Sequence, residues 1–204
     1  MTLANKITLV RALMAVVMFV CIIRGEFFAK LAALVIFILA AISDWVDGKI
    51  ARRTQTTTIF GAIADPFVDK ILVMGAFIAF LAVKPLNVPF WAVFLILARE
   101  LTISTLRVLA AIKGKILSAE RSGKFKTAVQ FIAVLIILII LNFQSLAEIE
   151  SSYSDMAKIV NFVVAQLPYA LTVITAVVSW ISGVSYIKNH WKLLSDTWSA
   201  PEKK

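Results

Sequence analysis

The chain consists of long apolar runs that are separated by short polar breaks. About 20 consecutive apolar residues are needed for a helix to cross a bilayer. We expect six membrane helices. Their predicted bounds are about Ile7–Ile23, Phe27–Lys49, Thr58–Val83, Phe90–Ile112, Lys126–Leu146 and Leu167–Tyr186.

The polar breaks fix the order of these helices. Arg24-Gly25-Glu26 ends the first run, and the stretch Arg52 to Thr56 separates the second run from the third. The prolines in the segment Lys84 to Pro89 predict an interruption of helical structure before the fourth run. The polar stretch Glu148 to Lys158 predicts a loop with a short helix. We therefore predict an all-α, polytopic membrane protein in which residues 1–204 form a single domain.

Composition supports the membrane class. Hydrophobic residues make up 61% of the chain and charged residues 16%, against roughly 45–50% and 25% in soluble domains. The net charge of +9 would favour nucleic acid in a soluble protein, but membrane proteins concentrate Lys and Arg in cytoplasmic segments. We expect no nucleic-acid partner. Because the basic residues gather on one side of the predicted helices, we expect both termini to be cytoplasmic.

Four aspartates interrupt the second and third apolar runs. Asp44 and Asp47 are three residues apart, and Asp65 and Asp69 are four apart, so each pair shares one helical face. Asp47 lies about five residues before the turn and Asp65 about seven after it. A rise of 1.5 Å per residue puts both roughly 7–11 Å inside the cytoplasmic end. We expect the four carboxylates to converge there.

A cluster of acids at membrane depth needs compensation, because an ionisable group there costs several kcal/mol. Carboxylate oxygens suit Mg²⁺, Mn²⁺ or Ca²⁺. Two carboxylate pairs could hold two ions roughly 3.5–4 Å apart, an arrangement used in phosphoryl chemistry. The alternative is a structural role in which the acids pair with Arg52, Arg53 and Lys70.

The spacing of these residues resembles the signature of the CDP-alcohol phosphotransferase family at every fixed position. The matching pattern is Asp44-x2-Asp47-Gly48-x2-Ala51-Arg52-x8-Gly61-x3-Asp65-x3-Asp69. The predicted layout of six helices, with the signature across the cytoplasmic ends of the second and third, is similar to that of the family as well. The resemblance places the active site at those ends.

The resemblance also implies roles for these residues. By the family's pattern, a divalent metal, Mg or Mn and as two ions, would be held by Asp44, Asp47, Asp65 and Asp69. Asp69 would in addition act as the catalytic base. It would take the proton from the hydroxyl group of the alcohol substrate, which is the acceptor of the transferred group. The CDP-lipid pocket would be formed by Gly48, Ala51, Arg52 and Gly61.

The N-terminal segment Asn5 to Arg11 resembles the opening motif of the family, with Ala4 in place of a proline and Ile7 in place of a leucine. Asn5, Thr8 and Arg11 follow one another at steps of three residues, so they can share the helical face that lines the CDP-lipid site. The alternative for Arg11 is snorkelling to the membrane interface.

A second set of cations suggests a phosphate on the acceptor. Arg107, Lys124 and Lys126 could bind it by charge-assisted hydrogen bonds, or they could be ordinary cytoplasmic loop charges. Ala98-Arg99-Glu100 and the segment Gly123 to Thr127 resemble segments of phosphatidylglycerophosphate synthases, a bacterial branch of the family. That resemblance favours sn-glycerol 3-phosphate as the acceptor.

The resemblance thus implies CDP-diacylglycerol and glycerol 3-phosphate as substrates, phospholipid biosynthesis as the role, a homodimer, and the bacterial inner (cytoplasmic) membrane as the location. A related enzyme that uses inositol phosphate, or a free alcohol such as serine, is the first alternative. From another class, a cation transporter could use the four acids as a transit site.

Overall fold

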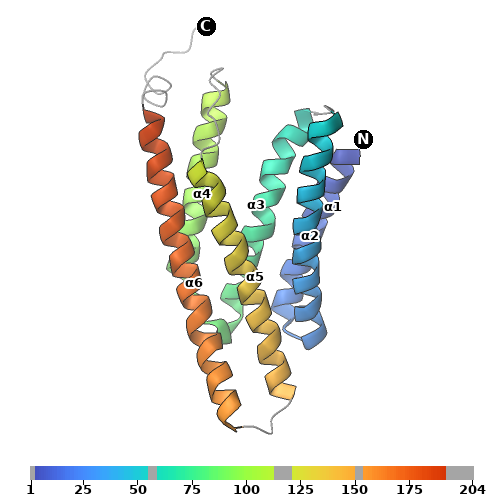
Figure 1. Cartoon of the computed structure of the whole chain (residues 1–204), viewed down its shortest axis with the longest axis vertical. Helices are drawn as coiled ribbons and strands as arrows, with labels where there is room; N and C mark the ends of the chain where they lie inside the picture. The colour runs from blue at the N-terminus through green and yellow to red at the C-terminus, as the bar shows by residue number, and fades with distance from the viewer. Residues whose placement is uncertain (1–2, 55–58, 113–120, 150–153, 192–204) are drawn as a thin grey trace. The chain divides into compact units, whose positions relative to one another are not determined.

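The computed structural model describes the backbone of residues 3–54, 59–112, 121–149 and 154–191, and within these ranges it contains helices and no strand. Side chains are described for residues 9–43, 68, 70–110, 123–144 and 162–191. The helices are α1 (Leu3–Arg24), α2 (Phe27–Thr54), α3 (Ile59–Ala82), the short 3-10 helix η1 (Lys84–Leu86), α4 (Phe90–Ile112), α5 (Arg121–Ile149) and α6 (Ser154–Asn189) (Figure 1).

The sequence predicted the existence of each long helix, and α4 begins and ends at the predicted residues. The predicted loop over residues 148–158 is wrong in extent. α5 continues to Ile149 and α6 begins at Ser154, which leaves only residues 150–153 between them, outside the described residues. The helices extend beyond the apolar runs for a physical reason. An apolar run marks only the part of a helix that can lie in lipid, whereas the backbone of the polar flanking residues can form helical hydrogen bonds equally well.

The chain divides into two compact units, and each is described here by itself. Unit 1 comprises Met1–Val88 and Ala133–Tyr169, and unit 2 comprises Pro89–Ile132 and Ala170–Lys204. α5 and α6 therefore contribute one part to each unit.

Unit 1 is organised around α1, which packs against both α2 and α3 (Figure 1). The polypeptide turns from α1 into α2 at Gly25, whose φ of 73° lies in the left-handed region that glycine adopts without steric cost. α1 buries a stripe at helical spacing that includes Ala15, Met18 and Ile22. Because α1, α2 and α3 alternate in direction, the start of α1 and the ends of α2 and α3 that face residues 55–58 lie at the same end of this unit (Figure 1).

Unit 2 contains α4, the first part of α5 and the last part of α6. Its core changes character along α4: Ala92, Val93 and Ile96 are buried apolar residues, and Arg99 and Glu100 follow as buried charges. The inner face of α6 is a stripe of buried hydroxyl residues with alternating steps of three and four, namely Thr172, Thr175, Ser179 and Ser182.

The outer surfaces are apolar. Large exposed hydrophobic side chains cover α1 and α6, with Leu13, Val16, Ile174 and Ile181 more than half exposed. By length and composition, two described helical segments can cross a membrane, Gly123–Gln144 and Phe162–Asn189, and Phe27–Ser43 and Lys70–Ala82 form shorter apolar helices. Apolar helices with apolar outer faces are what a bilayer requires, and the described helices are consistent with a membrane protein.

Candidate active site

The backbone places the four aspartates at two levels of unit 1. Asp47 lies seven residues before the end of α2 at Thr54, and Asp65 lies six residues after the start of α3 at Ile59, so both are about 10 Å from the helix ends. Asp44 and Asp69 are each ten residues from the same ends, about 15 Å. The side chains of all four lie outside the described residues, so their predicted convergence stays a prediction.

The register of α2 and α3 relates these positions to the packed faces of the two helices. On α2 the buried stripe Ala33, Phe37, Ala40 advances by steps of four and three residues. α2 continues unbroken to Thr54, and the same steps reach positions 44, 47 and 51. On α3, positions 65 and 69 lie one heptad before the buried Leu72 and Ala76, which is nearly the same helical face.

Arg11 is the predicted site residue of unit 1 whose side chain is described. It is only 3% exposed and begins the buried stripe of α1 that continues through Ala15, Met18 and Ile22. It lies eight residues after Leu3, about 12 Å along α1 from its start. Burial inside the unit is the opposite of snorkelling, which exposes the head group.

The remaining predicted residues of the CDP-lipid pocket are placed by backbone alone. They lie on α1, on the last turns of α2 and on the first turn of α3, and their side chains are outside the described residues. They are Asn5, Thr8, Gly48, Ala51, Arg52 and Gly61.

Unit 2 contains a buried charge network. Glu100 of α4 accepts hydrogen bonds through its Oε1 from Arg99 Nη1 at 2.9 Å and from the Nζ of Lys126 on α5. All three residues are at most 6% exposed. Two cations thus share one carboxylate, so these three side chains carry a net charge of +1 within the unit.

α6 completes this network. Arg99 donates from Nε to the backbone oxygen of Ser179 at 3.1 Å and from Nη2 to Ser182 Oγ at 3.2 Å. Gln130 of α5 donates to Ser179 Oγ at 3.3 Å. The part played by Ser179 and Ser182 of α6 was not predicted from the sequence. The alternating spacing of Thr and Ser along an otherwise apolar helix was the available signal, because such stripes mark hydrogen-bonding interfaces between membrane helices.

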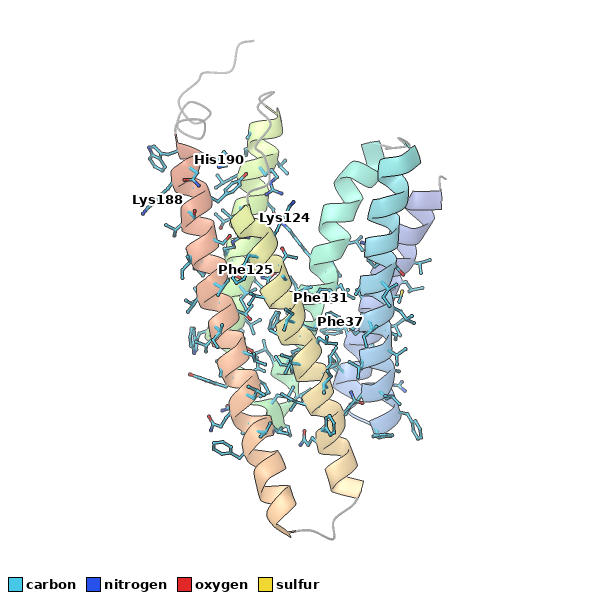
Figure 2. The ribbon with its side chains drawn as sticks, viewed as in Figure 1. Phe37, Lys124, Phe125, Phe131, Lys188 and His190 are labelled. Atoms are coloured by element: carbon cyan, nitrogen blue, oxygen red, sulfur yellow. The ribbon has the colours of Figure 1, made fainter. Side chains whose placement is uncertain are left out.

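The three cations that are predicted to bind the acceptor phosphate differ in burial. Lys126 is buried in the network with Glu100, whereas Lys124 is exposed near the start of α5 (Figure 2). Arg107 is exposed, and its guanidinium lies 5.7 Å from the centre of the Tyr186 ring. Arg107 follows Glu100 by seven residues, about 11 Å along α4, so it lies about two turns from the level of Lys126.

The fit of a divalent metal depends on the aspartates of α2 and α3. Within the part of the chain whose side chains are described, no group of three or more His, Cys, Asp or Glu residues could hold a metal ion. The four aspartate positions lie outside that part. Their carboxylates are the hard oxygen ligands that Mg²⁺ and Mn²⁺ prefer, and their shared helical register is compatible with a common site.

Comparisons with known proteins agree with the signature. The family model described as CDP-alcohol phosphatidyltransferase matches residues 1–187. A relative from Bacillus subtilis, named CDP-diacylglycerol–glycerol-3-phosphate 3-phosphatidyltransferase, is 33% identical over 204 residues, covering 94% of this chain and 96% of the relative. A protein of that name from Mycoplasma pneumoniae is 36% identical over 72% of this chain and 62% of its own length.

A relative from Mycobacterium tuberculosis, named a probable phosphatidylglycerophosphate synthase, is 39% identical over 65% of this chain and 63% of its own length. The matches to the Mycoplasma and Mycobacterium proteins thus span slightly less than two thirds of those relatives. The family match extends over nearly the whole chain and includes all four aspartates of α2 and α3. This chain belongs to the CDP-alcohol phosphatidyltransferase family.

Proposed function

We propose that this protein transfers the phosphatidyl group of CDP-diacylglycerol to sn-glycerol 3-phosphate, giving phosphatidylglycerophosphate and CMP. The observation that carries the proposal is the helical register of unit 1. The aspartate positions of α2 and α3 continue the buried faces of these helices, and α1, which packs against both, buries Arg11. Acids and a buried cation at one end of three packed helices suit a nucleotide diphosphate. The names of the relatives support the choice of both substrates.

Asp44, Asp47, Asp65 and Asp69 would hold the divalent metal, Mg or Mn and in our proposal two ions. Bound there, the metal would neutralise negative charge on the diphosphate and on the departing CMP. Its carboxylate ligands lie on two helices joined by a short connection, residues 55–58, so one folded hairpin supplies them all.

The reaction itself is a displacement at phosphorus. The hydroxyl oxygen of the acceptor attacks the phosphorus that is linked to diacylglycerol, and the bond from that phosphorus to the oxygen of CMP breaks. The proton of the hydroxyl passes to the Asp69 carboxylate, which is the base in this proposal. Orientation of the two substrates by the protein then supplies much of the rate, since it removes the entropic cost of their encounter.

The CDP-lipid would lie against α1, α2 and α3. Gly48, Ala51 and Gly61 would let the substrate approach the helix backbone closely, because small residues leave room there. Arg52 and Arg11 would contact the phosphates as charged hydrogen-bond donors. Asn5 and Thr8 precede Arg11 at steps of three residues on α1 and would add polar contacts on the same face.

The acceptor phosphate would bind to cations of unit 2. Lys126 contributes part of the net positive charge of the buried network, and Arg107 and Lys124 are exposed cations on the same unit. In this proposal Lys126 is the fixed member of the set, and the two exposed residues engage the phosphate as it enters from water. Cations suit an acceptor that bears a phosphate, because they can bind it by charge-assisted hydrogen bonds, better than they suit a neutral alcohol such as serine.

The membrane setting follows the same chemistry. We place six membrane helices in a bacterial inner membrane, with both termini cytoplasmic, since basic residues of the sequence gather on one side of the predicted helices. The lipid donor then arrives from the bilayer, while glycerol 3-phosphate and CMP exchange with the cytoplasm. A homodimer is the proposed assembly.

The test is an acceptor panel with the purified protein in lipid nanodiscs. The protein is incubated with CDP-diacylglycerol, Mg²⁺ and either glycerol 3-phosphate, inositol phosphate or serine, and both CMP and the lipid product are measured. We expect release of CMP with glycerol 3-phosphate and loss of this activity in EDTA, restored by Mg²⁺ or Mn²⁺. Turnover with inositol phosphate or serine, and none with glycerol 3-phosphate, would overturn the proposed acceptor.

A further inference from the structure

We propose that Gly183 and Ser182 of α6 form a seat that positions Arg99 and, through Glu100, fixes the ammonium group of Lys126. This inference rests on the proposed function, in which Lys126 binds the acceptor phosphate. It makes two residues of α6 positioning residues for acceptor binding, although neither carries a charge.

The seat depends on the missing side chain at position 183. A Cβ atom added to Gly183 would lie 3.2 Å from Cγ and 3.3 Å from Nε of Arg99, closer than most Cβ contacts in proteins. Arg99 cannot easily give way, because its guanidinium is held at three points by Ser179, Ser182 and Glu100. An alanine at this position would therefore push the Arg99 side chain by a few tenths of an ångström against these hydrogen bonds.

The helix backbone shows why a glycine is needed here. In an α-helix the carbonyl of residue 179 accepts a hydrogen bond from the amide of residue 183. Arg99 Nε reaches that same carbonyl of Ser179 at 3.1 Å. The side chain of residue 183 would stand beside this carbonyl, so its absence leaves the approach open for the arginine.

A shift of Arg99 would be transmitted to Lys126. Arg99 Nη1 and Lys126 Nζ both donate to the same oxygen of Glu100, Oε1. If the guanidinium of Arg99 moves, the carboxylate of Glu100 can follow it and so move relative to Lys126. Otherwise it loses the hydrogen bond from Arg99 and interacts more strongly with Lys126. Either change alters the position or the available charge of the ammonium group.

The experiment compares Gly183→Ala with Gly75→Ala. Gly75 is a helical glycine of α3 whose added Cβ would meet nothing within 4 Å, so its replacement should leave both KM values unchanged. For Gly183→Ala we expect the KM for glycerol 3-phosphate to rise about tenfold, the size of one weakened charge-assisted hydrogen bond. The KM for CDP-diacylglycerol should change less than twofold.

Ser182→Ala provides a second variant that adds no volume and removes the acceptor of Arg99 Nη2. We expect Ser182→Ala to raise the acceptor KM by a smaller factor. If Gly183→Ala fails to fold, Ser182→Ala alone tests the positioning role. A double-mutant cycle distinguishes a positioning role from a merely structural one, because it measures whether the effect of Gly183→Ala on the acceptor KM depends on Arg99. In an Arg99→Ala background, Gly183→Ala should no longer change the acceptor KM, because the Cγ and Nε atoms that it would crowd are both absent.

The outcomes separate this inference from the proposed function. If wild type is inactive with glycerol 3-phosphate, the proposed function and this inference both fail. If wild type is active but Gly183→Ala and Ser182→Ala behave like Gly75→Ala, or raise both KM values equally, only the positioning role is overturned. An effect of Gly183→Ala that persists in the Arg99→Ala background would overturn it as well.

Discussion

Replacement of Glu100 by glutamine tests the buried charge network most directly. The substitution keeps the shape of the side chain and removes its charge. Arg99 and Lys126 both donate to Glu100 Oε1, and all three residues are buried. The variant therefore leaves two buried cations facing a neutral amide.

The magnitude follows from this arrangement. Removal of one partner of a buried ion pair costs about 3–5 kcal/mol, because the other charge remains uncompensated. Glutamine retains a carbonyl oxygen that can still accept a hydrogen bond, so we expect a value near the lower limit, about 3 kcal/mol. For a chain of this length, that corresponds to a fall in Tm of about 6–12 °C.

The assay is thermal unfolding of the purified protein in nanodiscs, with Glu26→Gln as the matched control. Glu26 is exposed at the turn between α1 and α2, and exposed substitutions of this kind change stability by about 0.5 kcal/mol or less. We expect the control to unfold at the wild-type temperature. If Glu100→Gln does so too, the idea that Glu100 compensates two buried cations is wrong.

A second variant separates charge from packing. Glu100→Gln combined with Lys126→Met leaves one buried cation instead of two. Part of the lost stability should return, with a coupling of about 0.5–3 kcal/mol between the two sites. Additive losses would show that the cations are solvated or paired elsewhere.

Three further predictions concern single residues. Asp69→Asn should keep the fold and CDP-lipid binding but abolish turnover, because the base is lost; lost nucleotide binding would instead make Asp69 chiefly a metal ligand. Arg107→Ala should raise the KM for the acceptor more than the KM for the donor, because its charge suits the acceptor phosphate, and equal effects would contradict that assignment. Tyr186→Phe should leave Tm within about 2 °C of wild type. The buried hydroxyl has no hydrogen-bond partner among the described residues, so its removal leaves no other polar group without a partner. A larger fall in Tm would show that the hydroxyl has a partner.

The candidate site was accessible to sequence reasoning because its residues are local in the chain. Asp44 to Asp69 span one predicted helical hairpin, so spacing and helical period alone relate them. The structure adds the register of these positions to the packed faces of α2 and α3, and it shows that Arg11 of α1 is buried.

The sequence by itself determined the number and order of the long helices, the membrane character and the acidic signature. These features depend on apolar length and on short-range spacing, which a linear chain displays directly. Only the tertiary structure decided that Lys126 is buried against Glu100, and that Ser179, Ser182 and Gly183 receive Arg99 from a helix some 80 residues away. The reason is physical: burial and pairing are set by the rotation of each helix against its neighbours, and residues as small as glycine and serine give little sign of such contacts in the sequence.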